Sequence, residues 1–171
     1  STWNVSGGFD LTNANSFNAS SSHTLNMNGT GTFNAAGFTM SNLTASSTGV
    51  VTFAANTTTT VARNLTLKGS GTPVFTNTTI LMTSSSATID GGGKTLNNLT
   101  ASSTGTLTVS STDIIVGGNL TVATGMTLSI PTGRTATMTG SLGLNGTISG
   151  AGKMVYQGST AFPTTGNISS A

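Results

Sequence analysis

The chain has 171 residues, of which 37 are Thr, 23 Ser, 16 Asn and 23 Gly. Only eight residues are formally charged, none of them is Glu, and the net charge is +2, whereas about one quarter of an ordinary soluble domain is charged. The composition excludes a mainly helical domain, because Thr, Asn and Gly are poor helix formers. The absence of Cys also excludes disulfides, thiol catalysis and zinc–thiolate sites.

Short strands are predicted along the chain, most of them alternating an apolar residue with Thr or Ser. Such alternation places apolar side chains on one face and hydroxyls on the other. Asn-Gly and Gly-rich runs between the strands suit corners that need a positive φ. In chain order, the predicted strands are 50–53, 65–67, 80–82, 107–109, 114–116, 120–122, 126–130 and 142–144.

An internal repeat is the strongest feature of the sequence. The segments 32–49 (TFNAAGFTMSNLTASSTG) and 88–105 (TIDGGGKTLNNLTASSTG) are identical at eleven of eighteen aligned positions. Asn-Leu-Thr units begin at Asn42, Asn64, Asn98 and Asn119, so the middle gap is about half as long again as the gap on either side. If the middle gap contains two shorter turns, the mean coil is about 19 residues, which lies near the range of solenoid repeats.

We therefore predict an all-β fold, a β-solenoid (parallel β-helix) of roughly nine coils of about 19 residues. The whole chain, 1–171, is expected to be a single domain, with an N-terminal coil at 1–27, regular repeats at 28–150 and a C-terminal coil at 151–171. A β-sandwich is the alternative, because it uses the same strands and turns, but a sandwich does not explain the repeat. The Asn of each Asn-Leu-Thr unit suits either a side-chain ladder along the axis or a turn.

The segment 28–150 resembles bacterial and archaeal surface proteins of the adhesin and autotransporter-passenger kind. Units such as GTFNAAGFTMSNLTASSTGVVTF and GNLTVATGMTLSI carry this resemblance. It implies a Thr/Asn/Gly-rich β-solenoid at the cell surface or outside the cell, with a structural or adhesive role. It supplies no catalytic residues.

Catalytic and metal-binding patterns are scarce, and we expect no enzyme, no cofactor and no metal site. Asp90 and Asp113 lie about one coil apart, a spacing that would let them face each other like the two carboxylates of a glycosidase, but each also fits an ordinary turn, and Asp10 is remote. His23, the only His, is expected in an exposed turn. The Gly-Gly-Gly-Lys run at 91–94 lacks the spacing of a phosphate-binding loop.

The sequence gives only weak signals for partners other than copies of the chain itself. The cations are scattered, so no nucleic-acid surface is predicted, and no apolar run approaches the roughly 18 residues that would span a membrane. Glycans and solid surfaces stay open as partners. Eleven Asn-X-Ser/Thr sequons are candidate glycosylation sites if the chain is exported, or products of composition: Asn4, Asn18, Asn28, Asn42, Asn56, Asn64, Asn77, Asn98, Asn119, Asn145 and Asn167.

The two ends of the predicted solenoid are rich in aromatic residues. Trp3, Phe9 and Phe17 lie near one end, and Tyr156 and Phe162 near the other. They suit either caps over the core or the two halves of a head-to-tail interface, by which copies of the chain would form an open filament. With so few charges to protect the edges, we expect a filament subunit that adds strands end to end.

Two alternative functions remain at this point. The chain is a segment of a larger cell-surface adhesin, or it is an ice-binding solenoid. Thr-rich runs at 57–60 and 76–79 suggest a flat array of hydroxyls and methyls, but the Thr-X-Thr pairs do not recur at one regular coil length.

Overall fold

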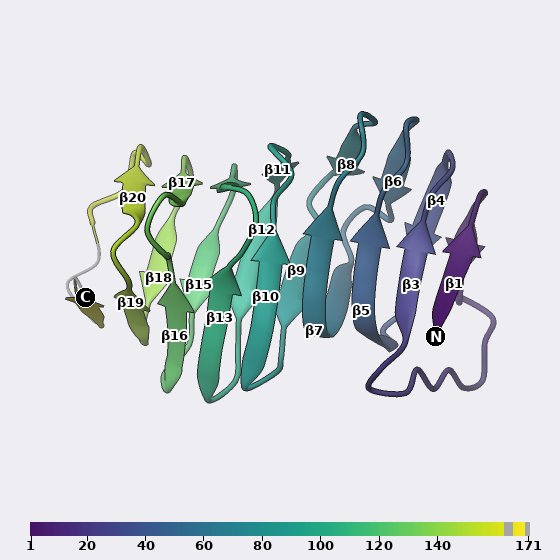
Figure 1. The fold of residues 1–171 in the computed structure, drawn as a ribbon, viewed down its shortest axis with the longest axis horizontal. Helices are drawn as coiled ribbons and strands as arrows, with labels where there is room; N and C mark the ends of the chain where they lie inside the picture. Colours follow the sequence, from purple (N-terminus) through teal and green to yellow (C-terminus); the bar gives the residue numbers. More distant parts are fainter. Residues whose placement is uncertain (163–165, 170–171) are drawn as a thin grey trace.

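The computed structural model describes residues 1–162 and 166–169. Every strand pairing among them is parallel and joins segments about one turn apart, and no helix occurs in these ranges. Figure 1 shows the rungs following one another along the long axis, from the purple N-terminal end to the yellow C-terminal end. The chain is therefore a β-solenoid, as predicted, and the sandwich alternative is wrong.

Each full turn has three walls, which we number in the order the chain visits them. Wall 3 contains the first parts of β5 (Thr39–Ala45) and β7 (Thr58–Leu67) besides its own strands, so walls 1 and 3 form one 13-stranded sheet, while wall 2 consists of two four-stranded sheets. Wall 1 contains β1 (Thr2–Val5), β3 (Thr24–Met27), β5 (Thr39–Ala45), β7 (Thr58–Leu67), β10 (Ser86–Asp90), β13 (Gly105–Val109), β16 (Met126–Ser129), β19 (Thr147–Ser149) and β21 (Asn167–Ser169). Wall 2 contains β2 (Phe9–Asp10), β4 (Gly31–Asn34), β6 (Val51–Phe53), β8 (Pro73–Phe75), β11 (Thr95–Leu96), β14 (Ile114–Val116), β17 (Thr135–Met138) and β20 (Lys153–Tyr156). Wall 3 continues with β9 (Thr79–Met82), β12 (Asn98–Ala101), β15 (Leu120–Val122) and β18 (Leu142–Leu144).

The turns of the solenoid differ in length from one another. The nine described strands on wall 1 enclose eight turns; the shortest runs from Thr24 to Asn42 and the longest from Asn64 to Thr88. The prediction of roughly nine coils of about 19 residues is thus close to the nine rungs and eight full turns of the structure. The number of residues per turn varies because the corners differ in length, while the strands remain paired with those of the neighbouring turns. Positions 163–165 and 170–171 of the predicted C-terminal coil lie outside the described part of the chain.

The sequence repeat does not correspond to whole turns. Leu43 lies on wall 1 in β5, but its counterpart Leu99 lies on wall 3 in β12; likewise Phe33 is on wall 2 and Ile89 on wall 1. The offset between the two copies thus covers two full turns and two further walls, and the repeating unit is one wall with its corner. The long gap between Asn64 and Asn98 is not two short turns but one turn and two thirds, from wall 1 to wall 3.

Inward-facing side chains stack into columns that form the core. On wall 2, Phe9, Phe33, Phe53 and Phe75 lie in successive rungs, with ring centroids 5.7, 5.2 and 4.3 Å apart. Phe33 and Phe53 are fully buried. Like residues in consecutive rungs fill the same space, so burial in each rung depends on the neighbouring rungs.

Asparagine ladders run along the outside of the solenoid. Nδ2 of Asn64 donates a hydrogen bond to Oδ1 of Asn42 at 2.9 Å, which confirms the ladder for the first two Asn-Leu-Thr units. In the other two units, the Oδ1 of Asn98 instead accepts a hydrogen bond from the backbone N–H of Asn119 at 2.8 Å. The first pair lies on wall 1 and the second at the start of wall 3.

Candidate functional site

The N-terminal end carries an exposed strand edge and an aromatic cluster. Within the described residues, β1 pairs only with β3, so its other edge is open. Trp3 lies in register with the buried Leu25 and points inward, yet its side chain is 42% exposed because no rung covers it. Phe17, from the loop between β2 and β3, contacts Trp3 and Phe9 edge to face, with centroids 5.8 and 5.9 Å apart.

The C-terminal end shows the same features without the covering loop. Strand β21 pairs only with β19 among the described residues, and Ile168, in register with the buried Ile148, is 54% exposed. A hollow of about 170 Å³ lies between Ile148, Met154 and Ile168, with backbone of the Gly150 corner along its rim. This end therefore presents an apolar hollow beside an open strand edge.

The structure brings the predicted interface residues together within each end. Trp3, Phe9 and Phe17 form one cluster, and Tyr156 and Phe162 contact each other edge to face at 5.4 Å. Phe9, Phe17 and Tyr156 are half-buried, whereas Phe162 is 44% exposed. The aromatic residues thus cover part of the core at both ends and leave exposed apolar surface on each. The exposed Ile168 was missed because a single Ile in a polar segment gives no sequence signal.

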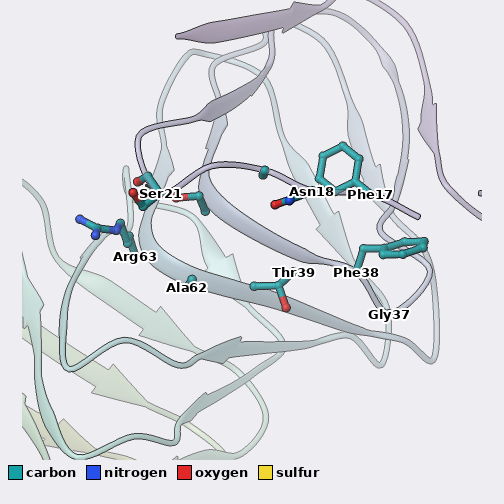
Figure 2. Close-up of a pocket in the computed structure, with 10 residues that line it drawn as sticks. Phe17, Asn18, Ser21, Gly37, Phe38, Thr39, Ala62 and Arg63 are labelled. Carbon is teal, nitrogen blue, oxygen red and sulfur yellow. Dashed lines mark hydrogen bonds between the residues drawn. The ribbon is translucent and has the colours of Figure 1, made fainter. Parts of the chain in front are cut away.

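A groove of about 510 Å³ lies between the loop that precedes β3 and the bend from wall 3 to wall 1. Figure 2 shows Phe17 and Phe38 close together, and Arg63 beside Ser21 farther along. The Phe17 and Phe38 rings are 6.2 Å apart. Arg63 makes no ion pair with the described part of the chain, and no carboxylate lines the groove. Sequence reasoning missed this groove, because its walls come from three separate segments of the chain.

The three Asp side chains accept hydrogen bonds at strand ends or corners, and Asp10 and Asp90 are the last residues of β2 and β10. Asp90 accepts a hydrogen bond from the hydroxyl of Thr112, and Asp113 accepts one from the backbone N–H of Thr135 at 2.8 Å. Hydrogen bonds from the hydroxyl and backbone N–H of Thr12 hold the pKa of the Asp10 carboxyl below its ordinary value. Among the described residues, no three His, Cys, Asp or Glu side chains gather as metal ligands.

His23 differs from its predicted place in an exposed turn. Its ring lies against Trp3, with centroids 3.9 Å apart, and Nδ1 is 3.1 Å from the Ser1 hydroxyl. Nε2 is buried and has no hydrogen-bond partner in the described structure. The position precedes β3 directly, so the ring faces the end of the core rather than solvent.

The sequons occupy several environments. Nine of the eleven Asn side chains are exposed, whereas Asn42 and Asn98 are half-buried. The Nδ2 atoms of Asn42, Asn64 and Asn77 donate hydrogen bonds to the preceding rung, and a glycan on any of these amide nitrogens would compete with that use. Exposed corner sites such as Asn28 and Asn145 have no such conflict.

Outward-facing hydroxyls form a regular array on wall 1. Over β13, β16 and β19, Thr106, Thr127 and Thr147 lie in one column, and Thr108, Ser129 and Ser149 in the next. The Thr-X-Thr and Ser-containing pairs are irregularly spaced along the sequence because the corners differ in length, but the strands align them in space. The predicted Thr runs at 57–60 and 76–79 do not make this array, because Thr59 and Thr78 are buried.

Comparison with protein-family models, with curated proteins and with solved structures finds no match to this chain. The architecture is a Thr/Asn/Gly-rich β-solenoid, while the resemblance to bacterial and archaeal surface proteins stays a prediction. The described residues include no helix that is long and apolar enough to cross a membrane.

Proposed function

We propose that the chain is the repeating subunit of an extracellular filament that grows head to tail by β-strand addition. One observation carries the proposal: β1 and β21 are open edges of the same wall, and each ends a column of inward-facing apolar residues. Parallel pairing of β21 with β1 of the next copy would continue wall 1 without a break. Main-chain hydrogen bonds would provide affinity, as in other cases of strand addition.

Side-chain chemistry at the two edges supports this pairing. Trp3 and Ile168 would become adjacent members of one buried column, and full burial of a large apolar side chain is worth about 1.5–3 kcal/mol. Neither strand carries a charged residue, although natural proteins commonly place Lys or Pro on open edges to prevent association. The low total charge adds little repulsion between copies.

The walls suit exposure to water outside a cell. They are covered with hydroxyl and amide groups, and the stability of the fold needs no disulfide. Exposed corner sequons would accept glycans without disturbing the core. In the alternative of a larger cell-surface adhesin, further turns of the same chain would cover the two edges.

Substitution of Ile168 by Lys tests the filament. A charge at the centre of the joint opposes burial of the column, and we expect the concentration needed for assembly to rise at least about tenfold, which corresponds to about 1.4 kcal/mol. Val50→Lys is the matched control, because Val50 is 43% exposed but lies between β5 and β6, away from the ends. Sedimentation velocity and negative-stain microscopy report assembly. Wild-type protein that stays monomeric at high concentration, or equal effects of both substitutions, would contradict the proposal.

Ice binding is a second candidate, supported by the hydroxyl array on wall 1. The side chains recur about 6.6 Å apart along a strand and about 4.8 Å apart between rungs, carry no charge, and hydrogen-bond to no other described residue. Thr127→Tyr should abolish any thermal hysteresis, whereas Thr121→Tyr, an outward position on wall 3, should not. Wild-type protein without hysteresis would eliminate this candidate.

A further inference from the structure

The groove beside the N-terminal loop is lined by Phe38 and Arg63, among others. Strand addition between β1 and β21 does not require these two side chains. The groove exists because the first turn has no strand on wall 3: the segment 11–23 forms a loop there, and the loop stands away from the bend at Ala62 and Arg63. Its volume of about 510 Å³ falls within the range of about 300–1,000 Å³ that is typical of small-molecule sites. Phe17 belongs both to this groove and to the aromatic cluster at the N-terminal end.

The aromatic part of the groove is held in place by packing. Phe17 contacts Trp3 and Phe9 on one side and Phe38 on the other, at centroid distances of 5.8, 5.9 and 6.2 Å. Both Phe17 and Phe38 are half-buried, so part of each ring remains accessible in the groove. Ring faces of this kind pack against flat apolar surfaces, including the C–H face of a sugar ring.

The rest of the groove is polar and positively charged. The guanidinium of Arg63 is exposed and has no ion-pair partner among the described residues. The side chains of Asn18 and Thr39 also make no hydrogen bond within the described structure, whereas the Ser41 hydroxyl donates to the Ser21 carbonyl at 2.8 Å. Arg63 therefore offers a planar fork of donors suited to a carboxylate or sulfate group, and the neighbouring amide and hydroxyl suit sugar hydroxyls.

We infer that this groove binds an anionic sugar, with the acidic group on Arg63 and a ring face on Phe17 and Phe38. Charge complementarity determines the class of ligand, because the groove contains one unpaired cation and no carboxylate among its described lining residues. The aromatic rings distinguish a sugar from a simple anion, which would gain nothing from them. Two sources share this chemistry, a uronic acid and a sulfated sugar.

Calorimetric titration of the full chain tests the inference with three probes of equal length: an oligogalacturonate, a sulfated oligosaccharide and a neutral oligosaccharide. We expect one or both anionic probes to bind and the neutral probe to bind at least tenfold more weakly. Arg63→Gln should weaken anionic binding at least tenfold. Lys68→Gln, an exposed cation just beyond β7 and absent from the groove, should leave it unchanged.

Phe38→Ser separates a sugar site from simple charge attraction. It should weaken binding of the anionic sugar several-fold and leave the weak binding of inorganic sulfate unchanged, while the unfolding curve shows that the fold persists. No binding of either anionic probe, equal binding of the neutral probe, or equal losses from Arg63→Gln and Lys68→Gln would overturn the inference. Because the readout is binding by single chains, these results do not depend on filament formation.

Discussion

Replacing Gly92 by Ala should destabilise the solenoid by about 4 kcal/mol or more, or prevent folding. A Cβ on Gly92 would lie 1.5 Å from the backbone carbonyl oxygen of Leu67 in the preceding turn. Neither atom can move away easily, because rungs of a parallel sheet are held about 4.8 Å apart by their hydrogen bonds. Gly92 also has a φ of +55°, which adds backbone strain for any other residue.

Gly93→Ala is the control for this substitution. Gly93 also has a positive φ, +70°, but a Cβ there would meet nothing within 4 Å. The control therefore keeps the backbone strain, about 1 kcal/mol, and removes the collision. Urea unfolding followed by circular dichroism gives both free energies. Similar small losses for the two variants would mean that the turns are not packed as closely as described.

Phe53→Ala should lower the free energy of unfolding by about 3–5 kcal/mol, the usual cost of removing a buried aromatic ring. Phe53 is fully buried between Phe33 and Phe75, at 5.2 and 4.3 Å. Because each rung contacts only its neighbours, amide exchange should increase mainly in β4, β6 and β8. Thr52→Ala, an outward-facing change in the same strand, should cost less than about 1 kcal/mol. A loss below about 1 kcal/mol for Phe53→Ala would refute the stacked column.

The alternation of apolar and hydroxyl residues predicted eight strands, and each overlaps an observed strand. Two of the strands that were missed have weak patterns: β17 presents Ala136 and Met138 to the core, and β10 presents Ala87 and Ile89. A short segment with one small inward-facing residue has little intrinsic preference for the β-strand conformation. It becomes a strand because the rungs on both sides offer hydrogen bonds and an apolar surface.

The sequence could not predict which strand lies on which wall, and the reason is physical. All three walls present the same pattern to the core, so the Asn-Leu-Thr units that begin at Asn42 and Asn98 fit wall 1 and wall 3 equally well. Turn length and wall identity emerge only when the rungs stack. The candidate site was predicted in part: the end aromatics were identified, but the position of His23 and the groove beside Arg63 depend on where the loop at 11–23 lies.

The axial repeat of the assembled protein tests the central claim most directly. The nine described strands of wall 1 and one joint give nine spacings of about 4.8 Å, or about 43 Å per subunit. Cryo-electron microscopy of wild-type filaments should show this repeat, with strands perpendicular to the axis and no break in wall 1 at the joint. Monomers that do not assemble at high concentration, or filaments built by side-by-side contact of walls, would contradict the account.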